Sequence, residues 1–364
     1  SVTYLPEGAI LLRNLIDRAA KAERFIFLEY FILAEGKLWD ELEKILCAKA
    51  REGVEVKIIF DDFGNIKRFS GETIDRLREV GVEVFIFNPV HEYVNRLHFN
   101  YRDHRKIACI DGDVAYTGGV NIADEYANII ERFGYWKDSG VCLEGDGAWG
   151  LTASFIRMCV NLGGVMHNEH DYYRPHTPVK SEGFCQPFTD GPQNNPDNPA
   201  EDVFLQMISG ARRFLYITTP YFIPDESLMR ALCIAGDGGV DVRLMLPGKP
   251  DHWYADCVAE SYFGELIKHG VKVYRYTPGF LHGKSIMVDR VAAFVGSVNM
   301  DYRSFELDYE CGVMVYGAPM IESLLEDMDM IVDHSRLVTK EEWAKRSVLR
   351  RVFEPLLRLF AIWM

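Results

Sequence analysis

Two short stretches of the chain carry the same set of residues that could do chemistry. The pattern H-x-K-x4-D occurs as His104, Lys106 and Asp111 and again as His282, Lys284 and Asp289. Each copy continues into a step of small residues that ends in an asparagine, Asn121 in the first and Asn299 in the second. A single copy would be weak evidence, because so short a pattern arises by chance. Two copies with the same continuation predict a built site.

The spacing inside each copy indicates which side chains act together. Residues two apart on a strand point to one face, so His104 and Lys106 are expected to share a face, as are the histidine and lysine of the second copy. Asp111 lies an odd number of positions from His104 and should point to the other side. We therefore expect the two motif aspartates to support the turn after the strand, although they belong to the catalytic pattern.

A hairpin after each motif would bring its asparagine back beside the histidine. If the first reversal is a two-residue turn at 112–113, Asn121 lies directly opposite His104, and a turn at 290–291 gives the same result in the second copy. Small residues next to the asparagines leave room near the backbone for the oxygens of a ligand. The residues expected to bind a substrate phosphate are Asn121, Asn299, Gly119 and Ser297.

Two such patches facing each other would form a site for phosphodiester exchange. One imidazole attacks phosphorus and the other protonates the departing alkoxide, since the free pKa of histidine, about 6.5, suits both tasks near neutrality. The lysines and asparagines would stabilise the non-bridging oxygens. Asp138 and Glu310 occupy equivalent places in the two copies, and we expect each to orient a histidine through its other ring nitrogen. This scheme needs no metal and no cofactor.

The motifs lie in a repeat that runs along most of the chain. Four glycines each precede a Val-x-Val run, as is typical of a helix end before a strand: Gly53, Gly81, Gly239 and Gly270. The Tyr-Phe-Ile steps at 30–32 and 221–223 also match. The alternation of helices and strands predicts an α/β fold of two pseudo-symmetric repeats. Each repeat would be a mainly parallel sheet flanked by helices, with the active site at the interface between them.

Composition divides the chain into four parts. We expect a first repeat at 1–165, a polar Pro/Asn-rich linker at 166–200, a second repeat at 201–335 and a tail at 336–364. The tail has seven Lys/Arg against three Asp/Glu, and its apolar residues recur at helical spacing. This pattern predicts a basic amphipathic helix that contacts an anionic membrane surface. The alternative is a helix that packs its apolar side on the protein.

Charge, cysteine content and the linker exclude several other classes. The formal charge of −14 argues against non-specific nucleic-acid binding, which depends on neutralising phosphates. No run of 18 apolar residues appears that could span a bilayer. Eight scattered cysteines without a CxxC pair predict buried free thiols in a reducing compartment. The linker contains His167, Glu169, His170, Asp171 and His176, but their spacing matches no standard metal site, which favours ordinary loop residues.

Paired motifs of this kind resemble the phospholipase D superfamily. The stretches 27–32, 100–107, 116–126, 219–224, 276–284 and 299–304 are similar, more narrowly, to bacterial cardiolipin synthases. The resemblance implies a phosphatidyltransferase that moves the phosphatidyl group of one phosphatidylglycerol to a histidine and then to the glycerol end of a second, giving cardiolipin and glycerol. It also implies that His104 is the nucleophile and His282 the acid and then the base, at the cytoplasmic side of a bacterial cell membrane.

Other functions stay open at the level of sequence. A phospholipase D that transfers the phosphatidyl group to water would use the same residues. A nuclease of the superfamily is disfavoured by the acidic balance, and a catalytically dead lipid-binding scaffold would leave both His-Lys pairs idle. Gly283 stands where the family often has alanine, and the membrane-spanning helices that usually begin such synthases are missing, which predicts a trimmed or short form. Motif residues do not decide the co-substrate, and some members use phosphatidylethanolamine.

Overall fold

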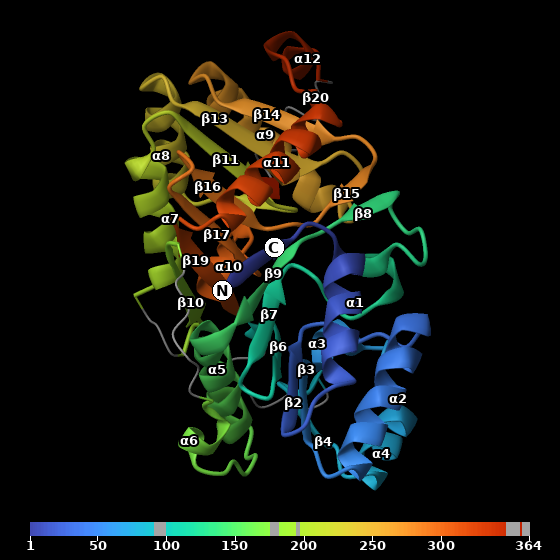
Figure 1. Ribbon diagram of the computed structural model, residues 1–364. Helices are drawn as coiled ribbons and strands as arrows, with labels where there is room; N and C mark the ends of the chain where they lie inside the picture. The colour runs from blue at the N-terminus through green and yellow to red at the C-terminus, as the bar shows by residue number, and fades with distance from the viewer. Residues whose placement is uncertain (91–99, 175–181, 194–196, 347–356, 359–364) are drawn as a thin grey trace.

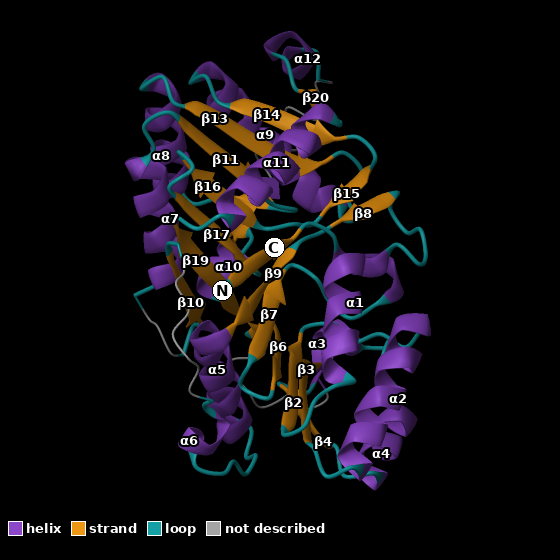
Figure 2. Ribbon diagram, viewed as in Figure 1, coloured by secondary structure: helices purple, strands orange, loops and turns teal. Residues whose placement is uncertain are grey.

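A computed structural model describes residues 1–90, 100–174, 182–193, 197–346 and 357–358. The chain forms two halves, one above the other in Figure 1, and each half is a sheet with helices on both faces (Figure 2). The first half consists of β1 (Val2–Leu5), α1 (Gly8–Ala19), β2 (Phe25–Tyr30), α2 (Lys37–Arg51), β3 (Glu55–Asp61), α3 (Asp62–Asn65), α4 (Gly71–Glu79), β4 (Glu83–Phe87), β5 (Arg102–Asp103), β6 (Lys106–Ile110), β7 (Val114–Gly118), β8 (Tyr135–Lys137), β9 (Gly140–Glu144) and α5 (Ala148–Asn161).

The second half repeats this succession after the short helix α6 (Glu169–Tyr172). It consists of β10 (Phe184–Asp190), α7 (Pro199–Gly210), β11 (Phe214–Thr218), β12 (Phe222–Ile223), α8 (Glu226–Asp237), β13 (Asp241–Pro247), α9 (Trp253–Lys268), β14 (Lys272–Tyr276), β15 (Gly279–Leu281), β16 (Ser285–Val288), β17 (Ala292–Gly296), β18 (Met300–Asp301), α10 (Tyr302–Glu306), β19 (Asp308–Tyr316) and α11 (Met320–Asp333). The strand β20 (Ser335–Leu337) and the helix α12 (Lys340–Ala344) follow.

The two sheets have the same strand order. It is β1-β9-β7-β6-β2-β3-β4 in the first half and β10-β19-β17-β16-β11-β13-β14 in the second, where β20 adds one more strand. The α/β class and the duplication are therefore confirmed. Along these two paths, the pairs within β2-β3-β4 and β11-β13-β14 are parallel and the other pairs are antiparallel. The sheets are thus mixed, because the chain after β4 and β14 continues in hairpins without intervening helices.

The second sheet begins inside the segment that the sequence assigns to the linker. Strand β10 pairs with β19 along its whole length, in the place that β1 takes beside β9 in the first half. Its Pro187 and its polar residues hide the strand pattern. An edge strand tolerates proline because one side of its backbone has no ladder to support. Of the polar linker, residues 182–183 and the short helix α6 are also described.

Three apolar clusters hold the layers together. One packs α1 and α2 on the first sheet around the fully buried Trp39, and another packs α7, α8 and α9 on the second sheet. The third is shared by the halves: Phe155 of α5 stacks on Phe27 of β2 at 4.6 Å between ring centroids, and Leu324 of α11 belongs to the same cluster. The sheets therefore form one packed unit. All eight cysteines are free thiols, and five of them are buried.

The hairpins after the two motifs differ from the expected two-residue turns. Ile110 pairs with Val114 and Val288 with Ala292, so each loop has three residues and the register is shifted by one. The reason is the motif aspartate, which is the first loop residue in each copy. Asp111 adopts φ 58° and Asp289 φ 53°, in the left-handed region, instead of ending the strand.

Both aspartates tie their loops to the start of the neighbouring strand. The Asp289 carboxylate accepts hydrogen bonds from the backbone N–H groups of Arg212, Arg213 and Phe214 at 2.7, 2.8 and 2.8 Å. Asp111 accepts the equivalent three bonds from residues 23–25 at 2.8–3.0 Å. These contacts agree with the supporting role expected from the parity of the motif, and they place both side chains away from the histidines.

Candidate active site

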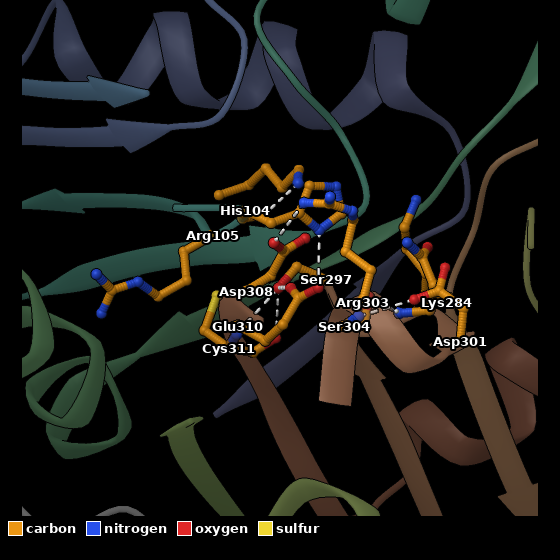
Figure 3. A network of polar contacts seen from close by, with 12 residues as sticks. His104, Arg105, Lys284, Ser297, Asp301, Arg303, Ser304, Asp308, Glu310 and Cys311 are labelled. Atoms are coloured by element: carbon orange, nitrogen blue, oxygen red, sulfur yellow. Dashed lines mark hydrogen bonds and ion pairs between the residues drawn. The ribbon is translucent and has the colours of Figure 1, made fainter. Parts of the chain in front are cut away.

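His104 is held beside a carboxylate of the other half by a strand pair that crosses between the halves. Strand β5 pairs with β19 in parallel, with Arg102 opposite Asp308 and Asp103 opposite Tyr309. One step further along this register, His104 meets Glu310. The backbone N–H of His104 donates to the Tyr309 carbonyl at 2.9 Å, and its Nδ1 is hydrogen-bonded to Oε1 of Glu310 at 2.8 Å (Figure 3).

A second parallel strand pair holds His282 in the same way, with the histidine in the second half and its carboxylate in the first. Strand β15 pairs in parallel with β8, with Leu281 opposite Lys137, and the next step brings His282 to Asp138. The N–H of His282 donates to the Lys137 carbonyl at 2.7 Å, and its Nδ1 is hydrogen-bonded to Oδ2 of Asp138 at 2.6 Å. The structure thus places each of the two expected carboxylates against a histidine. It adds that each histidine depends on the half that does not contain it.

Both histidines open onto one pocket of about 690 Å³ between the halves. Its lining combines the two histidines with both asparagines, several arginines and a set of aromatic and aliphatic side chains. Tyr126 and Trp136 lie against the His282 ring, each with its centroid 5.4 Å away, and Phe31 lies 5.1 Å from the His104 ring. The lining holds four arginines and four carboxylates, so its charged wall together with its apolar wall suits a ligand with a polar head and an apolar body.

The two lysines lie behind the histidines. Lys284 Nζ is 2.9 Å from both ring nitrogens of His282 and donates to its carbonyl oxygen at 2.6 Å, while Lys106 Nζ donates to the His104 carbonyl oxygen. Both lysines are almost fully buried. Burial lowers the pKa of Lys106 to about 8 and that of Lys284 to about 7. Their charges are therefore sensitive to pH near neutrality.

Burial also keeps both imidazoles neutral. It lowers the pKa of His104 well below its usual range, and the nearby positive charges of Lys106 and Lys284 lower it further. Burial and then the charge of Lys284 lower the pKa of His282 to about 4, although Asp138 acts in the opposite direction. A neutral imidazole has a free lone pair, which a nucleophile or a general base requires.

The two orienting carboxylates differ in charge. Burial raises the pKa of Glu310 to about 8, so this side chain is mostly protonated at pH 7. Burial also acts to raise the pKa of Asp138, but the charge and the hydrogen bond of His282, followed by the charge of Lys284, lower it. Asp138 is therefore ionised at pH 7. Equivalent positions thus carry different charges beside the two histidines.

The four residues expected to bind phosphate fall into two groups. Asn121 and Asn299 line the pocket with the histidines. Ser297 is fully buried, and its hydroxyl donates to Glu310, so the structure gives it a positioning role instead of the expected ligand contact. A Cβ on Gly119 would lie 2.2 Å from an Asp138 carboxylate oxygen. The glycine therefore makes space for Asp138 and not for a ligand.

Arginines are the functional side chains that the sequence argument missed. Arg102 and Arg303 line the pocket from opposite halves. Arg102 is two residues before His104, so the parity argument used for Lys106 would have found it. Arg303 donates to Asp308 at 3.4 Å and to the side chain of Asn100 at 2.7 Å. Figure 3 shows its side chain extending toward His104, whereas Arg105 extends away.

Within the described ranges, His104, Asp308 and Glu310 form the one group whose possible metal-ligand atoms all lie within 4.8 Å of one another. Each member of this group already has a partner in the protein: His104 Nδ1 is hydrogen-bonded to Glu310, and Asp308 forms an ion pair with Arg303. The group includes neither His167 nor His170 of the linker. His176 lies outside the described residues.

A duplicated α/β fold whose paired His-Lys motifs meet at one pocket defines a phospholipase D-like protein. The family model described as "Cardiolipin synthase, PLD-like domain" matches residues 12–129 and 204–332. The chain belongs to this cardiolipin synthase family.

Individual relatives support the assignment over nearly the whole chain. A cardiolipin synthase of Halalkalibacterium halodurans is 36% identical over 359 residues, which are 98% of this chain and 71% of the relative. A protein of Streptococcus mutans serotype c is 37% identical over 99% of this chain and 78% of its own length. The crystal structure of phosphatidylserine synthase from Haemophilus influenzae superposes with a TM-score of 0.72 over 99% of this chain and 92% of that one, at 16% identity, which indicates a shared fold.

Proposed function

We propose that the protein is a phosphatidyltransferase that makes cardiolipin and glycerol from two molecules of phosphatidylglycerol. The observation that carries the proposal is the crossed pairing of two histidines with two carboxylates at one pocket. The family match and the relatives named cardiolipin synthase support the choice of reaction. We take the nucleophile to be His104 and the proton carrier to be His282.

In the first step, Nε2 of the neutral His104 attacks the phosphorus of the donor lipid. A P–N bond forms, the P–O bond to the glycerol head breaks, and His282 gives its proton to the departing glycerol oxygen. The charges of the carboxylates support this division of roles. In the free protein His282 is neutral, with a pKa of about 4, so it must take up a proton when the anionic phosphodiester binds. The ionised Asp138 favours this imidazolium, whereas the protonated Glu310 leaves His104 neutral.

In the second step, a hydroxyl of another phosphatidylglycerol attacks the same phosphorus. His282 removes the proton from this hydroxyl, a new P–O bond forms, and the P–N bond to His104 breaks. Cardiolipin leaves, and both histidines return to their starting protonation states. Arg102 and Arg303, together with the lysines behind the histidines, supply positive charge for the phosphate oxygens in both steps.

We also propose that the protein works at a membrane surface, because its substrate resides there. No helix in the described part of the chain is long and apolar enough to cross a bilayer. The expected contact of the basic tail stays a prediction, since 347–356 and 359–364 lie outside the described residues. Within the rest of the tail, Trp343 packs against Gly264 of α9 and Leu357 packs on the second core. These two contacts favour the alternative of packing on the protein for this part.

Product analysis by mass spectrometry tests the proposal. The protein is incubated with phosphatidylglycerol vesicles beside His104→Ala and the control His269→Ala, which removes a histidine outside the pocket lining. We expect cardiolipin and free glycerol from the unchanged protein and from the control, and neither from His104→Ala.

Two results would contradict the transferase. Phosphatidic acid as the sole lipid product would identify a hydrolase that uses the same histidines. Absence of any product, both from phosphatidylglycerol alone and with phosphatidylethanolamine added, would remove phosphatidyl transfer between these lipids.

A further inference from the structure

The walls of the pocket differ between the halves, although the catalytic set is duplicated. The bridge between Leu33 and Ile122 corresponds to the pairing of Phe222 with Met300, because Ile122 and Met300 each follow the motif asparagine. Ile32 and Tyr221 are therefore equivalent. This structural alignment is shifted by two residues from the alignment that matches the Tyr-Phe-Ile steps at 30–32 and 221–223. An apolar side chain in the first half thus stands where the second half has a phenol.

The phenol of Tyr221 is hydrogen-bonded to one oxygen of the Asp251 carboxylate, and the other oxygen is available to a ligand. Asp251 lies in the loop between β13 and α9, at the carboxyl end of a parallel strand, and lines the pocket. Its Oδ2 accepts from the Tyr221 hydroxyl at 2.6 Å. Its Oδ1 is buried and has no hydrogen-bond partner among the described residues. A buried acceptor without a partner is unfavourable, so we expect a ligand to supply the donor.

The motif asparagines show the same difference between the halves. The Oδ1 of Asn121 accepts from the Ile32 backbone N–H at 3.1 Å, and its Nδ2 donates to the Tyr126 hydroxyl at 2.7 Å. Asn299 is 6% exposed, and its Oδ1 is buried without a partner among the described residues. Asn121 is thus occupied by the protein, whereas Asn299 has an acceptor left for a ligand.

The two unpartnered acceptors call for a ligand that brings hydrogen-bond donors. A phosphate cannot satisfy them, since its oxygens are acceptors. An ammonium group would be attracted by the carboxylates of the lining, but it would also meet the positive charges of Arg303 and of Lys284, whose pKa responds to the charge of Asp251. Neutral hydroxyl groups satisfy both oxygens without this repulsion, and two neighbouring hydroxyls would use both.

We propose that Asp251 and Asn299 bind neighbouring hydroxyls of the acceptor alcohol and thereby select a polyol head group over water and over simple alcohols. This inference rests on the proposed function, because it assigns the acceptor of the second step. Because a hydroxyl donates only one hydrogen bond, one hydroxyl of a glycerol head would donate to Asp251 and its neighbour to Asn299. The neighbour then attacks the phosphorus bound to His104 and gives its proton to His282. Holding the alcohol in this way raises its effective concentration at the phosphorus above that of competing water.

The test compares acceptors in the full chain. Phosphatidylglycerol vesicles are supplied with either 1,2-propanediol or 1-propanol, which differ by one hydroxyl, and the products are separated by mass spectrometry. The enzyme is compared with Asp251→Asn, which keeps the size of the side chain, and with the control Asp237→Asn, at a 60% exposed carboxylate outside the pocket lining. We expect the unchanged enzyme and the control to prefer the diol.

In Asp251→Asn, we expect the preference for the diol over 1-propanol to fall by about tenfold, and the ratio of cardiolipin to phosphatidic acid to fall similarly. Equal losses with both alcohols would assign Asp251 a structural role and overturn the inference, as would an unchanged preference. If Asp251→Asn does not fold, Tyr221→Phe decides the matter, because it frees Oδ2 and should change the same preference. Failure of the unchanged enzyme to form cardiolipin would instead overturn the proposed function.

Discussion

Asp138 and Glu310 contact equivalent nitrogens of the two histidines, yet their charges at neutral pH differ. The ionised Asp138 can stabilise an imidazolium at His282, whereas the protonated Glu310 cannot do so at His104. We expect Asp138→Asn to lower kcat by roughly 10²–10⁴-fold at pH 7, the size of loss that follows when a histidine loses an ionised partner. Steady-state kinetics with phosphatidylglycerol vesicles measure this loss. A loss below tenfold would contradict the charge assigned to Asp138.

Glu310→Gln should behave differently, because glutamine resembles a protonated carboxyl. Burial raises the pKa of Glu310 to about 8, so the wild-type side chain is neutral below that pH and gains a negative charge above it. The ratio of variant to wild-type kcat should therefore stay within about tenfold at pH 6.5 and depart further from one at pH 9. A ratio that is independent of pH would show that Glu310 does not change charge in this range.

At this scale the sequence predicted the duplicated histidines and asparagines of the pocket, but not the other side chains that line it. The position of Asp138 and Glu310 in the repeat was sufficient to select them as partners of the histidines, but not to predict which carboxylate pairs with which histidine. The role of Ser297 could not be predicted. Its hydroxyl reaches Glu310 only because the folded chain places residue 297 beside strand β19. Asp251 belongs to no recognisable sequence motif. Its relevance comes from an unpartnered oxygen, which is a property of the packed structure.

At the scale of elements, the loop after each motif strand anchors the repeat. The Asp289 carboxylate accepts three backbone hydrogen bonds at the start of β11. Asp289→Ala should lower the free energy of unfolding by about 2–3 kcal/mol, because it leaves these donors without their acceptor. Asp289→Asn keeps an acceptor oxygen and tolerates the left-handed conformation, so its loss should be less than half as large. Denaturant unfolding gives both values.

The activity per folded molecule of the Asp289 variants distinguishes a structural role of this residue from a catalytic one. If the motif aspartate only anchors the loop, kcat of the folded Asp289→Asn protein should stay within a few-fold of the wild-type value. A loss of kcat by a factor of about 10² with unchanged unfolding would assign Asp289 to the chemistry instead.

The strand pair β8·β15 fixes the position of His282. A Cβ on Gly279 would lie 2.2 Å from the Tyr135 carbonyl oxygen and 2.4 Å from its backbone nitrogen. Gly279→Ala should therefore push the two strands apart and weaken the contact between His282 and Asp138, with at least a roughly tenfold loss of kcat. Gly71→Ala is the matched control, because nothing lies within 4 Å of its Cβ position. Equal kcat values for the two variants would show that β8·β15 does not set the catalytic geometry.

The order of helices and strands was predictable because the repeat doubles every signal. Gly53 and Gly239 end helices before β3 and β13 as their pattern predicts, with φ 92° and 84°. The mixed sheet order and strand β10 were not predictable in the same way. Hairpin strands and edge strands are short and partly polar, so their pairing depends on partners far away in the sequence. The crossed pairs β5·β19 and β8·β15 are too short to leave a pattern.

At the scale of the whole molecule, a chain of charge −14 places positive side chains from both halves at the pocket between them, and the arginines among them are paired with carboxylates. Each half contributes one buried lysine, and Arg102 and Arg303 add to them at the pocket wall. The positive charge of this region is therefore a property of the assembled pair and not of either half. Since burial lowers the pKa of both lysines, the affinity of the pocket for an anionic lipid should depend on pH.

The sign and the range of that dependence follow from the two lysines. Lys284, with a pKa of about 7, and Lys106, with a pKa of about 8, are protonated at low pH and lose their charges in turn as the pH rises. Because kcat/KM reports the free enzyme, the proton that His282 must take up gives a plot of log kcat/KM against pH a slope near −1 well below pH 7. Loss of the lysine charges should steepen this slope by about one above about pH 7 and by about one more above about pH 8. In Lys284→Met the value of kcat/KM should be lower throughout, and the slope should steepen only near pH 8, where Lys106 loses its charge. Lys268→Met, at an exposed position of α9, should reproduce the wild-type curve. A wild-type curve of constant slope between pH 6 and 9 would show that the buried lysines keep their protons, and their positive charges would then be permanent.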